Sequence, residues 1–276
     1  MKDHKMTKKT TIALRPTKNK WVNGKLDLVI DGKPLELNFR VPSKPVKLRR
    51  MLPVFQQFSN RFNEIPIESL KAEGKEISCK AGCGACCRHA VPISESEAID
   101  LLDVLDAMPE ERQAEIRLRF AHGMEKLNAI SFFERYEKRK DESELAKLIL
   151  EYFAQGIPCP FLENESCSIH GSRPISCRDY LVTSPAKNCA SLTGEGVDRV
   201  KYQYNVKKAF FAINRDPELK DEKASFLPMI RMLEWSKEHG SDDSPTLEGI
   251  DWMQKFLAEL FGQSGTRTPK QPPDAA

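Results

Sequence analysis

Eight cysteines fall into two groups of four, and this grouping constrains what the chain can fold into more than any other feature of its sequence. The first group is compact and the second is spread over a longer segment: Cys79, Cys83, Cys86 and Cys87, then Cys159, Cys167, Cys177 and Cys189. Four thiolates are the set that one zinc ion or one cubane iron–sulfur cluster takes from a protein. Either each group completes its own metal site, or the fold brings both groups to a shared one.

The remainder of the sequence favours reduced thiols over disulfides. Residues 1–21 are basic and contain no apolar run long enough for a secretory signal. No later stretch reaches the roughly 20 apolar residues that span a bilayer. We therefore expect a cytoplasmic protein with no membrane partner. In that compartment closely spaced cysteines more often bind metal or carry redox chemistry than form disulfides.

The charge of the chain does not indicate a nucleic-acid partner. A formal net charge of +3 over 276 residues is small, although lysines and arginines crowd the N-terminal segment and residues 44–50. Neither basic run interleaves the aromatic side chains on which a single-stranded nucleic acid would stack. We expect solvated basic segments, a metal ion as the main partner, and a protein as a further candidate partner.

Hydrophobic periodicity predicts an α+β fold that is predominantly helical. Residues 25–30 and 34–41 alternate apolar and polar side chains around an Asp-Gly pair, which predicts an N-terminal β-hairpin. Ser94 and Glu97 have capping-box spacing before a helix that we expect to end at Pro109. Further helical stripes are predicted over residues 116–127, over 145–153 with Asp141 or Ser143 as the N-cap, and over 206–213, 226–233 and 250–260.

Residues 157–197 lose the helical period, and prolines and glycines punctuate this long irregular stretch. Such a segment is unusual inside a compact domain, but metal–thiolate bonds can supply the order that apolar burial does not. The sequence therefore predicts four parts: a basic disordered tail (1–20), a cysteine-cluster metal-binding domain that includes the hairpin (21–215), C-terminal helices (216–262) and a disordered tail (263–276). We expect the helices to pack beside the cysteine-rich region.

The spacing of the first group suits a single backbone turn around a metal. Cys79, Cys83 and Cys86 are separated by three and by two residues, and two glycines supply the freedom that the turn needs. Successive side chains of an extended backbone point to opposite sides, so we expect Cys87 to serve a different centre from Cys86, or none. Cys189, far from the other motif positions, is the weakest ligand candidate.

The motifs around the cysteines resemble those of a known family. In chain order they are Cys86-Cys87-Arg88, Cys159-Pro160-Phe161-Leu162, a further cysteine at Cys167, and Arg173-Pro174 followed after two residues by Cys177-Arg178. This series resembles the YkgJ-type cysteine-cluster family, a zinc- or iron-chelating domain, over about residues 79–189. The resemblance implies that the cysteines are the metal ligands. It implies no defined activity, and the activity of one relative, the flagellin lysine methylase, does not follow from shared cysteines.

The arginines within these motifs are predicted to lie beside the metal. Four thiolates around one zinc ion carry a net charge of about −2, which a guanidinium offsets while it donates hydrogen bonds to sulfur. We expect Arg88, Arg173 and Arg178 in this role, with Asp179 either orienting Arg178 or pairing with a surface lysine.

One histidine also has ligand spacing. Cys167 and His170 are separated by two residues, as in many zinc sites. The family that the motifs resemble commonly has Tyr at this position. We therefore expect His170 to lie beside the metal as a hydrogen-bond donor rather than on it.

Three classes of function fit the pattern, and no reaction can be named from it. The leading class is a metal-binding cysteine-cluster protein with an iron–sulfur cluster or zinc, where iron–sulfur is favoured because eight thiolates and an irregular protective loop suit a redox-active cluster. The second is a structural zinc module that binds protein or nucleic acid, although its cysteines would more usually be evenly paired. The third is an enzyme, either methylase-like or of the radical S-adenosylmethionine type. The barrel of radical S-adenosylmethionine enzymes needs alternating strands and helices, which the sequence pattern lacks.

Overall fold

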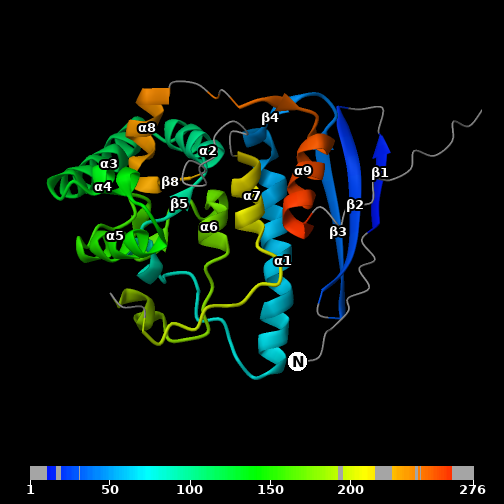
Figure 1. Cartoon of the computed structure of the whole chain (residues 1–276), viewed down its shortest axis with the longest axis horizontal. Helices are drawn as coiled ribbons and strands as arrows, with labels where there is room; N and C mark the ends of the chain where they lie inside the picture. The colour runs from blue at the N-terminus through cyan, green and yellow to red at the C-terminus, as the bar shows by residue number, and fades with distance from the viewer. Residues whose placement is uncertain are drawn as a thin grey trace, which may run out of the picture.

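The computed structural model describes residues 11–16, 20–30, 32–191, 195–214, 226–239, 242 and 244–262. Most of the two predicted tails, Asp31 of the predicted hairpin turn and Gly240 lie outside the described residues. Within the described ranges the fold is α+β and predominantly helical, as predicted (Figure 1).

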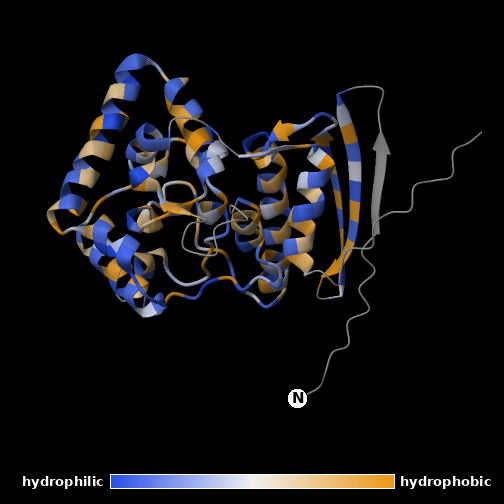
Figure 2. Cartoon of the chain, turned by 45° about the horizontal axis from the view of Figure 1, so that its top comes forward, coloured by the Kyte–Doolittle hydropathy of each residue, from blue (hydrophilic) through white to orange (hydrophobic). Residues whose placement is uncertain are grey.

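An antiparallel three-stranded sheet forms one side of the molecule (Figure 1). The predicted hairpin consists of β2 (Trp21–Ile30) and β3 (Lys33–Pro42), in which Leu26 lies opposite Leu37. Apolar and polar residues alternate along both strands, so one face is buried (Figure 2). A third strand, β1 (Thr11–Pro16), pairs with β2 inside the segment predicted as a tail. This strand was not predicted because its short β-branched and apolar run lies between lysine-rich segments.

A 21-residue helix, α1 (Leu52–Ala72), fills a segment for which no element was predicted. It follows the two-residue strand β4 (Val46–Lys47) and the 3₁₀ helix η1 (Leu48–Met51). Its buried face repeats at helical intervals through Phe55, Phe58 and Phe62. The signal was therefore present in the sequence, in the spacing of these phenylalanines.

The sheet, α1, α7 (Val206–Asn214) and α9 (Gly249–Phe261) enclose the first hydrophobic core. The ring of Phe55 lies 5.3 Å from that of Phe210 on α7 and 4.7 Å from that of Phe256 on α9. The strand β9 (Thr246–Leu247) pairs with β4, so the C-terminal helix returns to the N-terminal sheet. Helices on both sides of the predicted boundary at residue 215 thus share one core, and the domain boundaries themselves stay a prediction.

The second core is helical and contains α2 (Glu95–Asp106), α3 (Glu110–Ala129), α4 (Phe132–Lys138), α5 (Glu142–Ala154) and α8 (Met232–His239). The capping box is formed as predicted, because the Ser94 side chain accepts from the Glu97 backbone and the Glu97 side chain accepts from Ser94. Asp141 is the N-cap of α5. The short helix α4 was not predicted.

The helix predicted over residues 226–233 begins only at Met232. The residues before it form β8 (Leu227–Pro228), which pairs with β5 (Pro92–Ile93), and the 3₁₀ helix η6 (Met229–Arg231). Pro228 explains the difference, since proline lacks the N–H that a helix interior needs and disfavours helical backbone at the residue before it.

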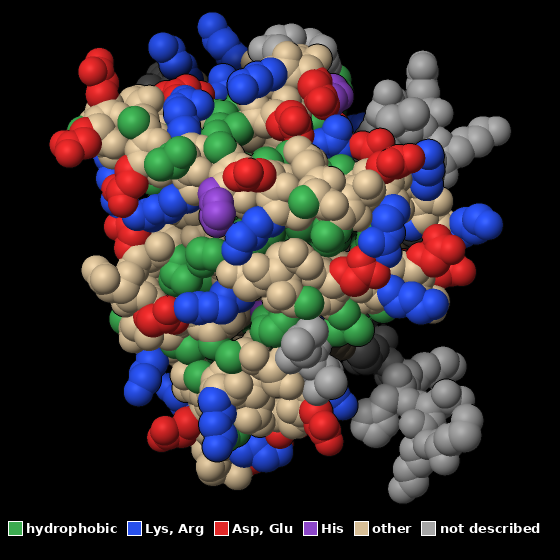
Figure 3. Space-filling view, turned by 90° about the vertical axis from the view of Figure 1, so that its left-hand side faces the viewer, with side chains coloured by type: hydrophobic (Ala, Val, Ile, Leu, Met, Phe, Trp, Pro, Cys, Tyr) green, Lys and Arg blue, Asp and Glu red, His purple; other side chains and the backbone are tan. Residues whose placement is uncertain are grey.

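The outer face of the second core is charged (Figure 3). Lysines and arginines are interspersed there with acidic residues rather than gathered in a patch of one sign. Within the described ranges, no helix combines the length and the apolar composition needed to cross a bilayer.

Candidate metal centre

The cysteine-rich segments run on irregular backbone between the two cores. All eight thiols are free; Cys189 is buried and the others are partly exposed. The only regular elements described between residues 157 and 191 are short: the hairpin of β6 (Leu162–Glu163) and β7 (Ser166–Cys167), the helix α6 (Ile175–Arg178), and the 3₁₀ helices η3 (His170–Ser172) and η4 (Ala186–Ala190). The predicted irregular segment is therefore present.

The first group forms a compact knot of turns, as its spacing predicts. The N–H of Cys83 donates to the carbonyl of Lys80 at 3.1 Å, and Gly82 has a φ of +82°, which a glycine adopts without strain. The knot ends in the 3₁₀ helix η2 (Ala85–Arg88), so the backbone at Cys86 and Cys87 is not extended. The premise that these two side chains point apart is therefore wrong, because the Cys86 thiol hydrogen-bonds to the Cys87 side chain.

The knot contacts the second group directly. The N–H of Cys159 donates to the carbonyl oxygen of Cys87 at 2.6 Å. The Arg88 guanidinium binds both carboxylate oxygens of Glu165, at 2.6 and 3.1 Å, in the turn of the β6–β7 hairpin. A Cβ on Gly84 would lie 2.6 Å from Glu165 Oε2 and 3.2 Å from Glu165 Cα, so a larger residue there would displace the Glu165 side chain and press on its backbone. The fold thus brings the two groups side by side.

The last cysteine also returns to the knot. The helix η4, which carries Cys189, packs against η2, and His89 Nε2 lies 2.9 Å from the carbonyl oxygen of Cys189. At the entry to the knot, Ser78 donates to the carbonyls of Val182 at 2.9 Å and Thr183 at 3.1 Å. Cys189, the weakest candidate from sequence, therefore lies beside the first group.

Helix α6 holds Cys177 between the two cores. On one side, the Glu97 carboxylate accepts from the N–H of Ile175 at 2.8 Å, and burial raises the pKa of Glu97 to about 7. On the other side, the Asp179 carboxylate accepts from Ser59 on α1 at 2.6 Å, and Asn63 donates to the carbonyl of Arg178 at 3.0 Å. One element of each core therefore fixes the position of this short helix.

The three arginines differ in what they face. Arg178 is buried and donates to Asn60 Oδ1 at 3.2 Å and to the carbonyls of Arg173 (2.8 Å) and Gly171. Asp179 does not hydrogen-bond to it and instead accepts from Ser59, so neither predicted role of Asp179 describes its main contact. Arg88 lies beside Cys87, whose charge raises the pKa of its guanidinium after the larger effect of Glu165.

Arg173 is the arginine whose charge reaches thiols of both groups. Its guanidinium lowers the pKa of four cysteines against the larger, opposing effects of burial or of a neighbouring thiol: Cys79, Cys86, Cys167 and Cys177. The Nε of Arg173 also donates to the carbonyl of His170 at 3.2 Å. The His170 side chain is exposed.

Cys86 is electrostatically central among the thiols. Its own pKa is raised far above the ordinary value by the hydrogen bond to Cys87 and by burial. Burial raises the pKa of five more thiols from both groups, and the charge of Cys86 adds to each: Cys79, Cys159, Cys167, Cys177 and Cys189. Among them Cys177 is raised to about 12. In the described part of the chain, however, no three His, Cys, Asp or Glu side chains are arranged to hold a metal ion.

Two residues near the thiols were missed from the sequence. The Tyr180 side chain hydrogen-bonds to Cys189, and the Arg199 guanidinium lies over the Tyr180 ring, 4.9 Å from its centroid. Tyr180 follows the Cys177-Arg178 motif closely, so proximity in sequence could have indicated it. Arg199 is brought there by the antiparallel bridge between its backbone and that of Val182, which leaves no local signal.

Free thiols from two sequence groups lie on irregular backbone between the two hydrophobic cores, and this cluster of cysteines is the candidate metal centre. Residues 78–203 match the family model CxxCxxCC, described as "Putative zinc- or iron-chelating domain", which confirms the resemblance seen in the motifs. This segment is thus of the zinc- or iron-chelating type. No curated protein and no solved structure matches the chain.

Proposed function

We propose that the chain binds metal in two adjacent four-thiolate sets, each built from both sequence groups. The first set is Cys79, Cys83, Cys86 and Cys189, and the second is Cys87, Cys159, Cys167 and Cys177. The hydrogen bond of 2.6 Å between the N–H of Cys159 and the carbonyl of Cys87 carries this proposal, because it holds the two groups side by side.

The electrostatic neighbours of Cys189 and Cys159 support the division into sets. The pKa of Cys189 is raised by burial and then by the charges of Cys86, Cys79 and Cys83, which are the other members of its set. The pKa of Cys159 is raised by burial and then by Cys177 and Cys167, ahead of Cys86. For Cys189 and Cys159 the strongest thiol neighbours are therefore members of their own proposed set, whereas Cys86 lies beside Cys87 and its charge also reaches Cys167 and Cys177 of the second set.

The surrounding residues suit a thiolate centre. Metal binding requires deprotonated thiols and releases their protons. Arg173 stabilises thiolates of both sets by its charge, and Tyr180 donates a hydrogen bond to Cys189. Neighbouring donors and cations of this kind set the affinity and, for a redox-active group, the reduction potential.

We propose that the two thiolate sets hold iron–sulfur clusters, with zinc ions as the alternative. Eight thiols in two sets of four match two cubane clusters, and a bound cluster would supply one-electron transfer. A radical S-adenosylmethionine enzyme is not proposed, since the described strands pair only in antiparallel fashion and form no alternating strand–helix barrel. No substrate or reaction is assigned.

Anaerobic purification followed by elemental analysis and by visible and electron-paramagnetic spectra tests the proposal. Iron with labile sulfide and visible absorption is the expected result. Zinc without visible absorption would replace the clusters by zinc in the same sets. A folded chain that retains neither metal after reconstitution with either would contradict the proposal.

A further inference from the structure

Cys189 is held at its backbone and at its sulfur by two aromatic side chains. His89 Nε2 lies 2.9 Å from the carbonyl oxygen of Cys189, and the Tyr180 side chain hydrogen-bonds to the Cys189 thiol. A carbonyl only accepts, so His89 Nε2 carries the proton of its bond. The rings of His89 and Tyr180 have centroids 6.3 Å apart, and the Phe153 ring lies 4.6 Å from that of His89. A row of three rings, which begins at Phe153 on α5, therefore fixes the position of Cys189.

Arg199 determines the direction of the hydrogen bond at the sulfur. Its guanidinium lies 4.9 Å from the centroid of the Tyr180 ring, and it also hydrogen-bonds to the Tyr180 side chain. A guanidinium donates and cannot accept, so the phenol oxygen accepts from Arg199 and its proton is left for Cys189. A hydroxyl that accepts from a cation is also polarised into a stronger donor. Hydrogen bonds are thus donated in sequence from Arg199 to Tyr180 and from Tyr180 to the Cys189 sulfur.

Other donors and charges act on both proposed sets. Backbone groups hydrogen-bond to thiols of the first set and of the second: Val182 to Cys79, Phe161 to Cys159, and Ile169 to Cys167. The charge of Arg173 also reaches thiols of both sets. These contributions do not distinguish the sets. The Tyr180 hydroxyl adds a side-chain donor at one thiol of the first set.

We propose that Tyr180 is a positioning residue that makes the two metal centres unequal, because its hydroxyl withdraws electron density from the Cys189 thiolate and hence from the first centre. Hydrogen bonds to ligand sulfur help to set the reduction potential of an iron–sulfur cluster, and a donor favours the reduced state. The first centre therefore has a higher reduction potential than its four thiolates alone would give it. This inference rests on the two metal sets proposed above.

Cobalt(II) tests the inference whichever metal the chain binds natively. The metal-free full chain is titrated with Co²⁺ while the thiolate-to-cobalt charge-transfer absorption is recorded. Tyr180→Phe should still bind two ions, and the band of about half of the cobalt should move to lower energy, because the Cys189 sulfur then gives up electrons more easily. Two bound ions with the wild-type spectrum would overturn the role of Tyr180 and leave the sets intact. Fewer than two ions in the wild type would overturn the sets, and this inference with them.

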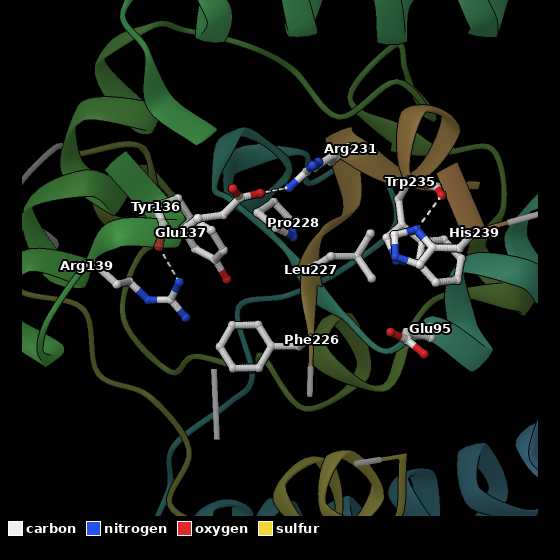
Figure 4. Close-up of a pocket in the computed structure, with 10 residues that line it drawn as sticks. All are labelled: Glu95, Tyr136, Glu137, Arg139, Phe226, Leu227, Pro228, Arg231, Trp235 and His239. Atoms are coloured by element: carbon white, nitrogen blue, oxygen red, sulfur yellow. Dashed lines mark hydrogen bonds and ion pairs between the residues drawn. The ribbon is translucent and has the colours of Figure 1, made fainter. Parts of the chain in front are cut away.

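Tyr136→Phe is the matched control. The Arg139 guanidinium lies over the Tyr136 ring, 4.0 Å from its centroid, as Arg199 lies over that of Tyr180. Tyr136, however, lines a cavity in the second core that no cysteine lines (Figure 4). The control should keep the wild-type cobalt spectrum, and a shift in it equal to that of Tyr180→Phe would contradict the assignment.

A second variant acts on the same donor from the surface. Arg199→Gln, at an exposed position, removes the cation that polarises the phenol and should move the same band in the same direction, by less than Tyr180→Phe. If Tyr180→Phe does not fold, Arg199→Gln is decisive by itself. A wild-type spectrum in Arg199→Gln would then overturn the inference.

In the chain that holds iron–sulfur clusters, redox titration followed by electron-paramagnetic resonance measures the same effect. Tyr180→Phe should lower one midpoint potential and leave the other unchanged. Loss of one hydrogen bond should shift that reduction equilibrium about threefold to tenfold, which is about 28 to 59 mV for one electron. Two unchanged potentials, or two that fall together, would overturn the inference.

Discussion

The backbone N–H of Cys159 donates to the carbonyl oxygen of Cys87 across 2.6 Å, and this bond joins cysteine groups that are far apart in the sequence. The irregular segment that begins near Cys159 therefore contacts the knot at its start. It contacts the knot again at its end, where η4 carries Cys189. The thiols are thus held by a loop whose two ends both return to one place. Each hydrophobic core lies on one side of it.

Removing the metal should loosen this loop more than the cores. The helices bury continuous apolar faces, whereas residues 158–189 bury only separate apolar side chains such as Phe161, Ile175 and Val182 and would depend on metal–thiolate bonds for the rest of their order. Hydrogen exchange on metal-free protein should show lost protection over residues 158–189 and retained protection in α3 and α5. Equal loss in both regions would mean that the metal and the helical core form one cooperative unit.

The buried Glu97 should make the stability depend on pH. Burial raises its pKa from 4.5 to about 7, so between these values the folded chain keeps a proton that the unfolded chain loses. Its contribution is therefore complete below pH 4.5 and is lost as the pH rises toward 7. In metal-free protein, unfolding by urea should show a decrease of roughly 2 kcal/mol between about pH 5 and about pH 7 from this residue.

Glu97→Gln should remove that decrease. Glu95→Gln, an exposed position on the same helix, is the control and should keep it. An unchanged slope in Glu97→Gln would show that the carboxyl is ionised in the folded protein at low pH and would contradict the raised pKa.

Elements set by local sequence were predictable, and those set by distant contacts were not. The Ser94–Glu97 capping box depends on four consecutive residues alone, and the structure contains it. The second contact of Glu97, to Ile175 on α6, joins segments whose proximity no spacing indicates. The helix α1 was not predicted, although its phenylalanines repeat at helical intervals, because Pro66 inside the helix interrupts the local helical signal.

The same distinction applies to the site. The turn around Cys83 follows from its short spacings and glycines, whereas the position of Cys189 depends on η4 packing against η2. The backbone at Cys86 and Cys87 was wrongly expected to be extended, because a 3₁₀ helix forms there, whereas the assignment of Cys87 to a different centre stays a prediction. Side-chain direction between neighbours depends on backbone conformation, which two adjacent letters do not specify.

The positive charge of Arg173 should increase the affinity of the thiols for metal. Burial raises the pKa of Cys79 and Cys167 and the Arg173 guanidinium opposes this rise, so Arg173→Gln should leave these thiols harder to deprotonate. We expect metal affinity to fall about tenfold or more in competition with a chelator, with a larger loss at lower pH. Arg173→Lys should recover most of the affinity. Arg117→Gln, which removes a surface ion pair with Asp106, should change nothing.

If Arg173→Lys lost as much affinity as Arg173→Gln, the charge would not be the cause. A loss of affinity independent of pH would lead to the same conclusion. Either result would assign Arg173 a structural role through its hydrogen bond to the carbonyl of His170.

The metal content of two double variants, measured side by side, tests the two sets most directly. Cys79→Ser with Cys189→Ser removes two ligands from one set, so about half of the wild-type metal should remain. Cys79→Ser with Cys177→Ser removes one ligand from each set, so almost none should remain. Equal metal content in the two double variants, or more metal in the second than in the first, would contradict the assignment.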